Sequence, residues 1–282
     1  MRPLALFLRE IRIEHTLFAL PFAYVGAIIA ARGIPAPAAL VWITLAVLGA
    51  RTAAMAANRF LDREIDANNP RTARRALASG TLSPASMLWA TAAGLLVLLA
   101  AAWMLNPLCV ALMPVAALLL LTYPLCKRFT WLTHFVLGAV DGLAPLGASI
   151  GIAGRVTLPA IALFAAVTVW VAGFDIIYAL MDLDVDCAQG ILSLPARFGE
   201  TSGRVLPILL HGVMFVLLAA AGMFANAGPI YFLGVLSVVG LIIYEEYLFR
   251  SGADIFAINE RVFIGNMTFS VLFLVTTIGG FL

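Results

Sequence analysis

Long apolar runs constrain this chain more than any other feature. Stretches of about 20 apolar residues, the length needed to cross the hydrocarbon core of a bilayer, follow one another with short polar breaks between them. In lipid, every backbone polar group must be satisfied within the spanning structure. Continuous apolar runs do this as helices, whereas barrel strands would alternate polar and apolar residues. We therefore predict an all-α integral membrane protein.

The breaks at charged residues, Gly and Pro divide the 282 residues into nine candidate transmembrane helices. A soluble protein is nearly excluded, because 63% of the residues are hydrophobic and only 11% are charged, against roughly half and roughly a quarter in ordinary soluble domains. No linker interrupts the series, so we expect one transmembrane domain over residues 1–282. The nine predicted helices cover about 12–32, 38–61, 84–104, 107–125, 131–153, 158–181, 205–226, 229–248 and 262–282.

The basic residues predict the orientation in the membrane. Of the 17 Lys and Arg, 14 fall in the N-terminal segment and in the loops after the second, fourth, sixth and eighth predicted helices. Such residues concentrate on the cytoplasmic side. We therefore expect a multi-pass protein of the inner (cytoplasmic) membrane, with its N-terminus cytoplasmic and its C-terminus external. No basic run is long enough to indicate nucleic-acid binding.

A first polar cluster lies at the end of the second predicted helix. Asn58, Asp62 and Asp66 follow at intervals of four residues, which places them on one helical face. Two carboxylates and an amide oxygen on one face can share a divalent cation. Arg51 continues that face about two turns deeper, and an arginine inside a membrane helix is a candidate functional residue because its burial is costly.

A second polar cluster lies at the end of the sixth predicted helix. Asp182 and Asp186 share a face by the same spacing, and Asp184 points away from it. Tyr178 lies one turn deeper and Asp175 two turns deeper than Asp182. Because both clusters enter the membrane from the same side, four or five carboxylates should gather at one depth.

Gathered carboxylates repel one another at low dielectric unless a cation neutralises them. Mg²⁺ can do so, and it typically binds through a few carboxylates together with substrate phosphate oxygens. A single pair of this kind is as often a solvated helix end, but two copies with an Asn and a buried Arg favour a Mg²⁺-diphosphate site. Neighbouring basic residues that can hold the remaining charge of a diphosphate are Arg71, Arg74, Arg75, Lys127 and Arg128.

Other polar residues fall within the apolar runs. Asp141 lies about ten residues inside a predicted span, so it faces either the cavity or a partner such as Arg51. His15, His134 and His211 lack the spacing typical of metal ligands, and we interpret them as structural or interfacial.

Over nearly its whole length the sequence resembles the UbiA superfamily of intramembrane prenyltransferases. Asn58 to Asp66 resembles the NxxxDxxxD motif of the family, and Tyr178 to Asp186 resembles its YxxxDxxxD motif. Three further segments resemble its loops: Asn69-Pro-Arg71-Thr, Arg75-Ala-Leu-Ala-Ser-Gly80 and Tyr123-Pro-Leu-Cys-Lys127-Arg128. His15-Thr-Leu-Phe-Ala-Leu-Pro-Phe-Ala23 and Gly173-Phe-Asp175 look more like the 4-hydroxybenzoate polyprenyltransferase-like branch, which includes enzymes assigned to the futalosine route to menaquinone.

This resemblance implies nine helices around a central cavity, with the active site at the cytoplasmic side. It implies Mg²⁺-dependent transfer of a polyprenyl group from polyprenyl diphosphate to an aromatic acid, in ubiquinone or menaquinone biosynthesis. The implied metal ligands are Asn58, Asp62, Asp66, Asp182 and Asp186. The implied diphosphate contacts are Arg51, Arg71, Arg75, Tyr123, Lys127 and Arg128. Catalytic roles fall to Asp182, Tyr178 and Asp175, and from its depth Asp175 is our candidate for receiving the ring proton.

The sequence departs from the family motifs at two positions, and two alternative functions stay open. Ala76 stands where many members have Pro, and Leu192 stands where many have Lys or His, which removes a possible diphosphate contact. A CDP-alcohol-type membrane phosphotransferase is one alternative, although Asp141-Gly-Leu-Ala-Pro does not continue as its motif does. A divalent cation transporter is the other, although its acids should lie near mid-membrane. The acceptor stays open among 4-hydroxybenzoate, a dihydroxynaphthoate and a flavin- or haem-like ring, as do the prenyl length and the oligomeric state.

Overall fold

A computed structural model describes residues 6–7, 10 and 16–282 of the chain. Within these residues the protein is helical and contains no strand, as the sequence predicts. Eight helices are long and apolar enough to cross a membrane. They comprise α3 (Pro37–Ala67), α4 (Pro84–Leu105), α5 (Pro107–Cys126), α6 (Thr133–Ala153), α7 (Leu158–Ala179), α10 (Glu200–Ala225), α11 (Pro229–Arg250) and α12 (Ile255–Phe281).

The first predicted span corresponds to α2 (Thr16–Ala31), whose apolar part, Phe18–Ala31, is shorter than the other eight. The predicted start of this span, and His15, lie outside the described residues. Its side chains from Phe18 onward pack inward, with Phe22 only 1% exposed.

Several helix boundaries differ from the sequence prediction, and α3 ends at Ala67 rather than near 61, while α10 begins at Glu200 rather than near 205. The last helix begins at Ile255 rather than near 262, because Asp254 caps it by accepting hydrogen bonds from the backbone N–H groups of Phe256 and Ala257. The sixth predicted helix does not continue to 181. Instead α7 ends at Ala179 and is followed by a 3-10 turn, η2 (Leu180–Asp182), and by the short helices α8 (Leu183–Gln189) and α9 (Leu194–Phe198).

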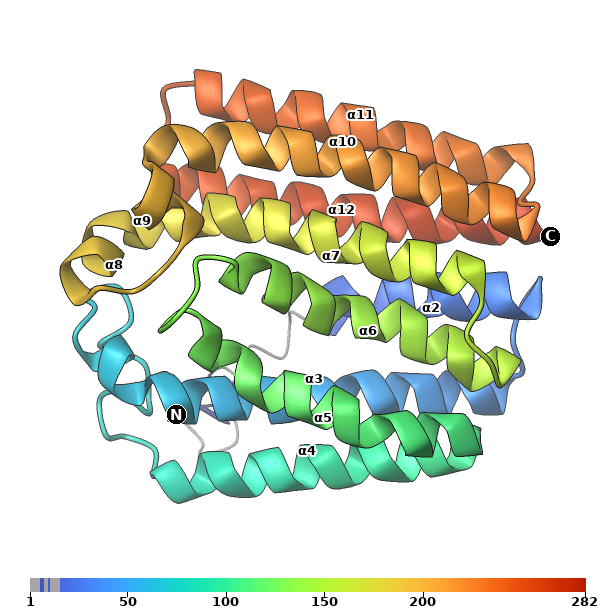
Figure 1. The fold of residues 1–282 in the computed structure, drawn as a ribbon, viewed down its shortest axis with the longest axis horizontal. Helices are drawn as coiled ribbons and strands as arrows, with labels where there is room; N and C mark the ends of the chain where they lie inside the picture. Colours follow the sequence, from blue (N-terminus) through green and yellow to red (C-terminus); the bar gives the residue numbers. More distant parts are fainter. Residues whose placement is uncertain (1–5, 8–9, 11–15) are drawn as a thin grey trace.

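One end of the bundle is made of tight turns. Asn106 accepts a hydrogen bond from the Cys109 N–H at the start of α5, and its amide donates to the Ile150 carbonyl near the end of α6. Pro107 follows it at the first position of α5, where a missing N–H costs nothing. The longer connections, including α8 and α9, lie together at the opposite end (Figure 1).

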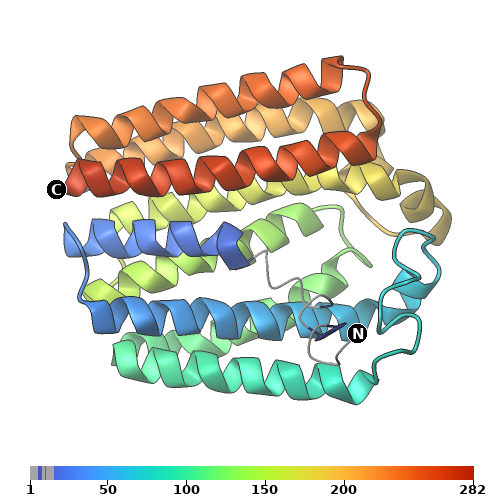
Figure 2. The ribbon, with the colours of Figure 1, turned by 180° about the vertical axis from the view of Figure 1, so that it is seen from behind.

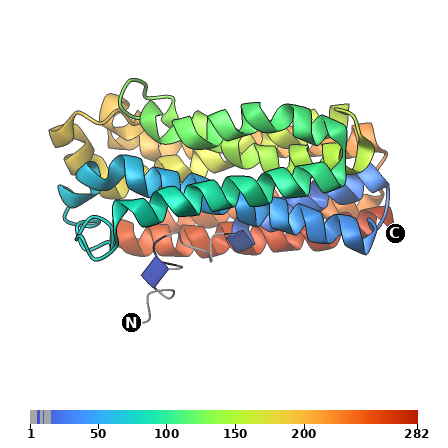
Figure 3. The same cartoon turned by 90° about the horizontal axis from the view of Figure 1, so that it is seen from below.

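The long helices run side by side around the molecule (Figures 1 and 2). The element contacts close a ring, in which α2 packs against both α6 and α12, and α6 packs against α7. Helices α3, α4 and α5 form one side, and α7, α10, α11 and α12 form the other (Figure 1). Seen from below, the segments α8 and α9 and the α3–α4 connection extend past the bundle at the same end (Figure 3).

Small residues bring the helices close together. A Cβ on Gly138 of α6 would lie 2.1 Å from the Thr168 carbonyl oxygen of α7, and a Cβ on Gly49 of α3 would lie 2.7 Å from that of Gly94 in α4. Such contacts let backbones pack directly in a membrane, where burial of apolar surface gives no driving force.

Candidate active site

A polar cavity of about 690 Å³ opens at the loop-bearing end, between α3, α5, α6, α7 and α12. It is lined by every predicted metal ligand and by every predicted diphosphate contact except Arg128. Tyr178 and Asp175 line it as well, whereas Asp184 is exposed and lies outside it, as the helical spacing predicts. The structure therefore brings the two acidic clusters of the sequence into one cavity.

The first cluster lies entirely on α3, because this helix continues to Ala67. Asn58 donates a hydrogen bond from Nδ2 to Asp62 Oδ2 over 3.3 Å. Lys127 Nζ, from the α5–α6 loop, lies 2.6 Å from the same carboxylate, and Arg128 Nη2 lies 3.8 Å from its other oxygen. Asp62 is only 3% exposed, so its charge is compensated chiefly by this basic loop.

Asp66 has its own basic partners one turn further along α3. Arg75 Nη1 lies 2.7 Å from both of its carboxylate oxygens, and Arg59 Nη1 lies 3.8 Å from one of them. The loop that carries Arg75 is anchored by Thr72, whose hydroxyl donates to the Asp66 carbonyl. Sequence reasoning missed Arg59, which points into the bundle and is 6% exposed.

The second cluster is not on one continuous α-helix, although Asp182 and Asp186 face the same cavity, as their spacing of four residues predicts. The 3-10 turn at Leu180–Asp182 interrupts the helix, and Asp182 becomes the residue that precedes α8. A 3-10 turn has about three residues per turn, so it changes the direction of Asp182 and Asp186 relative to the side chains of α7. Both carboxylates still line the polar cavity.

Arg71, from the loop that follows α3, binds the second cluster. Its Nε donates to Asp182 Oδ1 over 2.8 Å, its Nη2 pairs with Asp182 Oδ2, and its Nη1 donates to the Tyr178 hydroxyl over 2.9 Å. Burial alone would lower the pKa of this guanidinium, but the hydrogen bond to Asp182 and the proximity of Tyr178 raise its pKa above the ordinary value. Asn69, which the sequence indicated only as part of a loop, also donates to Asp182.

The donor set fits a hard divalent cation. The four carboxylates predicted as metal ligands and the Asn58 amide line one cavity, and Mg²⁺ takes oxygen ligands of this kind. Across residues 6–7, 10 and 16–282, no three Asp, Glu, His or Cys side chains are already arranged around a single metal position. Mg²⁺ commonly uses only one or two protein carboxylates and completes its octahedron with water and phosphate oxygens, so this arrangement suits a metal that arrives with a diphosphate.

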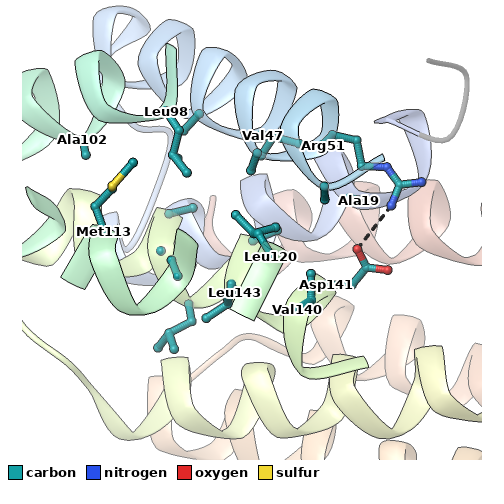
Figure 4. A pocket seen from close by; sticks show the side chains of 18 of the residues that line it. Ala19, Val47, Arg51, Leu98, Ala102, Met113, Leu120, Val140, Asp141 and Leu143 are labelled. Atoms are coloured by element: carbon teal, nitrogen blue, oxygen red, sulfur yellow. Dashed lines mark hydrogen bonds and ion pairs between the residues drawn. The ribbon is translucent and has the colours of Figure 1, made fainter. Parts of the chain in front are cut away.

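An apolar cavity of about 300 Å³ continues from the polar one, between α3, α4, α5 and α6. The two cavities share Arg51 and Asp141, whose side chains face each other over 3.4 Å (Figure 4). The expected partner of Asp141 is thus confirmed. The Arg51 Nε is buried without a hydrogen-bond partner. Beyond this pair the walls are apolar side chains such as Leu98 and Leu143 (Figure 4).

Asp175 lies in the wall of the polar cavity and pairs with His134, a residue that the sequence left as structural. His134 Nδ1 lies 2.7 Å from Asp175 Oδ2, and its Nε2 accepts a hydrogen bond from the Leu194 backbone N–H over 3.2 Å. The Asp175 side chain is 24% exposed, so part of its carboxylate stays open to the cavity. The sequence could not reveal this pair, because its members are 41 residues apart.

A second group of buried polar residues lies away from both cavities. His211 Nδ1 of α10 lies 2.8 Å from Glu245 Oε2 of α11, and Asn266 of α12 donates to Glu245 Oε1 over 2.9 Å. Trp170 of α7 donates to Asn266 Oδ1 over 2.6 Å. This cluster joins four helices and lines neither cavity. It agrees with the interpretation of His211 as structural.

Comparisons with known proteins agree with this geometry. Residues 19–266 match the model of the UbiA prenyltransferase family, and the chain belongs to that family. It is therefore a prenyltransferase, and the resemblance to the 4-hydroxybenzoate polyprenyltransferase-like branch is confirmed. The 4-hydroxybenzoate octaprenyltransferase of Alkalilimnicola ehrlichii is 33% identical over 90% of this chain and 88% of its own length. That of Nitrosococcus oceani is 34% identical over 86% of this chain and 85% of its own.

Solved structures show the same fold. A UbiA homologue from Aeropyrum pernix superposes with a TM-score of 0.86 at 32% identity, over 96% of this chain and 99% of that one. A homologue from Archaeoglobus fulgidus, solved with GPP and Mg²⁺ bound, has a TM-score of 0.73 at 19% identity, over 97% of this chain and 99% of that one. The family assignment therefore favours a prenyltransferase over the phosphotransferase and transporter alternatives.

Proposed function

We propose that this protein transfers a polyprenyl group from polyprenyl diphosphate to a ring carbon of an aromatic acid, with Mg²⁺ as the cofactor. The proposed acceptor is 4-hydroxybenzoate or a dihydroxynaphthoate, which places the reaction in ubiquinone or menaquinone biosynthesis. The observation that carries the proposal is the convergence of two acidic clusters and their basic partners in one cavity that continues into an apolar one. The names of the two bacterial relatives support the first acceptor.

The polar cavity would receive the diphosphate. Asp62, Asp66, Asp182 and Asp186, with Asn58, are the proposed metal ligands. Mg²⁺ bound there would stabilise the charge that develops on the departing pyrophosphate. Three basic residues form ion pairs with these carboxylates in the structure: Arg71, Arg75 and Lys127. Each is a proposed diphosphate contact, since its long side chain can turn from a carboxylate to a phosphate oxygen.

Tyr123 and Arg128 complete the proposed diphosphate contacts. Tyr123 reaches the cavity from α5 and is 8% exposed. Arg128 does not line the cavity, but its Nη2 donates to the Leu61 carbonyl over 2.6 Å and lies 3.8 Å from Asp62 Oδ1. Tyr178 accepts a hydrogen bond from Arg71, so it would keep that guanidinium directed at the leaving group.

Arg51 is better placed for the acceptor than for the diphosphate. It lies seven residues before Asn58 on α3, which is about 10 Å deeper along the helix axis. Asp141 occupies only Nη1, and Nε has no partner. A guanidinium with free donors is suited to a carboxylate. We propose that Arg51 binds the carboxylate of the aromatic acid, in place of the diphosphate contact that the sequence suggested.

Asp175 would accept the ring proton. In the proposed reaction the C–O bond between the prenyl group and the diphosphate breaks, and a C–C bond forms between that prenyl carbon and the ring. The ring proton then passes to the open oxygen of the Asp175 carboxylate, and pyrophosphate leaves. Phe18, Phe174 and Phe263 line the cavity nearby, and apolar walls of this kind exclude water that would otherwise hydrolyse a reactive allylic cation.

The apolar cavity would hold part of the prenyl tail. Its walls beyond Arg51, Asp141 and Tyr123 are almost wholly apolar. One lining residue, Val115 of α5, is 59% exposed on the outer face of the bundle, so a long tail could continue into the bilayer.

For the membrane arrangement we propose nine spans, with α2 as the first, in the inner membrane. The N-terminus and the active site would face the cytoplasm and the C-terminus the outside. The supporting observation is that the loop-bearing end carries most of the basic residues, as the positive-inside rule requires of a cytoplasmic face.

The test uses the full chain in nanodiscs with Mg²⁺ and with geranyl or longer prenyl diphosphates. 4-Hydroxybenzoate and 1,4-dihydroxy-6-naphthoate are offered side by side, and products are identified by mass spectrometry. We expect one acceptor to form a prenyl adduct with release of pyrophosphate. The adduct should disappear when EDTA removes Mg²⁺ and in Asp62→Asn, but not in the control Asp184→Asn, whose side chain lies outside the cavity.

An adduct that forms equally in EDTA would overturn the role of Mg²⁺. Absence of both adduct and pyrophosphate release with either acceptor would overturn the proposed reaction.

A further inference from the structure

His134 holds the segment 190–199 against the active site. This segment follows α8 and includes α9, and Ile191, Leu192 and Ser193 line the polar cavity. Its attachment includes two hydrogen bonds. Leu192 N–H donates to the Lys127 carbonyl over 2.8 Å. Leu194 N–H donates to His134 Nε2.

The two bonds of His134 fix its protonation pattern. A backbone N–H can only donate, so Nε2 must be the unprotonated nitrogen that accepts from Leu194. In a neutral imidazole the proton then lies on Nδ1, which donates to Asp175 over 2.7 Å. One ring thus receives a hydrogen bond from the segment 190–199 and passes one to Asp175. His134 itself is only 2% exposed, so neither bond is replaced readily by water.

We propose that His134 is a positioning residue that couples the seating of the segment 190–199 to the orientation of the Asp175 carboxylate. When the segment is in place, the imidazole is locked and holds Asp175 Oδ2, which leaves the other oxygen directed at the cavity. When Leu194 moves away, the ring loses its acceptor bond and its fixed orientation. Asp175 is then no longer held for proton transfer. The inference rests on the proposed role of Asp175.

The chemistry of the two bonds selects the test variants. The amide of glutamine has one donor and one acceptor, so His134→Gln can donate to Asp175 and accept from Leu194. His134→Leu has a similar bulk and can do neither. The pair therefore separates the hydrogen bonds of His134 from its packing, and thermal unfolding of both variants in detergent shows whether either has lost its fold.

Two measurements test the coupling. Hydrogen exchange followed by mass spectrometry on a peptide covering 190–199 reports the Leu194 amide without any turnover. We expect exchange about tenfold faster in His134→Leu, since one hydrogen bond is lost, and near the wild-type rate in His134→Gln. In the adduct assay, kcat should fall at least about tenfold in His134→Leu, because misplacing a reacting group slows the reaction. In His134→Gln, kcat should recover to within about threefold of the wild-type value.

The double variant with Asp175→Asn decides whether His134 acts through Asp175. If it does, His134→Leu costs little further activity once the carboxylate is gone, so the two effects do not add. Equal losses from His134→Leu in both backgrounds, or equal losses in His134→Leu and His134→Gln, would overturn the proposal. An unchanged hydrogen-exchange rate of the Leu194 amide in His134→Leu would also overturn the proposal. A wild-type protein that forms no adduct would instead overturn the proposed function.

Discussion

Two groups of ionisable residues lie within this apolar bundle, and they differ in what surrounds them. At the loop-bearing end, Asp62, Asp66 and Asp182 line a cavity, and their partners are long basic side chains, most of them from loops. On the other side of the ring, His211 and Glu245 are 0% and 1% exposed and line neither cavity. Placing charge inside a membrane is costly. The first group offsets this cost with basic partners at a cavity, and the second offsets it with polar partners that are fully buried.

The difference separates function from structure. The cations at the cavity can exchange a carboxylate for a ligand, because each one is carried on a long side chain with several rotatable bonds. Glu245 instead lies 2.8 Å from His211 Nδ1 of α10 and accepts a hydrogen bond from Asn266 of α12. A fully enclosed network of this kind rigidifies its surroundings and is costly to break. We therefore expect variants in the first group to lose activity and variants in the second to lose stability.

The largest effect is expected at Asp182. In Asp182→Asn, a carboxylate that holds Arg71 and is a proposed metal ligand loses its charge. Loss of one such electrostatic contact typically lowers turnover by about 10²–10³, and we expect the upper end of this range in the adduct assay. The unfolding temperature in detergent should change little, since the cavity stays open to water. A large loss of stability with unchanged turnover would reverse the comparison.

Glu245 should show the opposite pattern. Glu245→Ala leaves His211 and Asn266 buried without their partner, which for a buried pair costs about 3 kcal/mol or more. Thermal or denaturant unfolding in detergent measures this loss, and the activity of the remaining folded protein should stay within about twofold. The matched control is Glu246→Ala. Glu246 pairs with Arg250 on the exposed surface, where an ion pair contributes at most about 1 kcal/mol.

Similar unfolding curves for the two variants would show that the buried cluster contributes no more than a surface pair. If Glu245→Ala lost more turnover than folded protein, the buried cluster around Glu245 would contribute to the reaction itself.

A substitution at Arg51, which lines both cavities, tests what binds where the two cavities meet. Arg51→Lys keeps a positive charge but loses the planar fork that suits a carboxylate. We expect KM for the aromatic acid to rise about tenfold, which corresponds to about 1.4 kcal/mol, with little change in KM for the prenyl diphosphate. Arg63→Lys, at an exposed position paired with Glu64, serves as the control. An equal rise for the diphosphate would return Arg51 to the diphosphate site that the sequence suggested.

The sequence predicted the fold class and most of the site because both depend on local patterns. Apolar runs set the helices, and the spacing of four placed Asn58, Asp62 and Asp66 on one face of α3, as the structure confirms. The same spacing correctly placed Asp182 and Asp186 in one cavity, but it did not reveal the 3-10 turn that ends at Asp182. No residue in Leu-Met-Asp forbids an α-helix, so the 3-10 turn there is not visible in the sequence.

Contacts between distant segments were beyond such reasoning. His134 and Asp175 lie 2.7 Å apart although 41 residues separate them, and Asn69 reaches Asp182 across 113 residues. No local sequence pattern around either residue of such a pair indicates which residue it contacts. The pairing of Arg51 with Asp141 was the exception, because two isolated charges inside apolar spans each require a partner.

The smallest expected effect concerns the apolar cavity. Ala46 of α3 lines it and is half-buried, so Ala46→Leu should narrow the space proposed for the tail. Overpacking of this kind usually costs about 1–3 kcal/mol where nothing can move, but here the added atoms project into open volume. We expect the use of long prenyl diphosphates to fall about threefold relative to geranyl diphosphate, because only the long tail would meet the added methyl groups. Ala92→Leu, on the exposed face of α4, should leave this ratio unchanged. If both variants keep the wild-type ratio, the tail lies elsewhere, and the apolar cavity is separated functionally from the polar one that it adjoins.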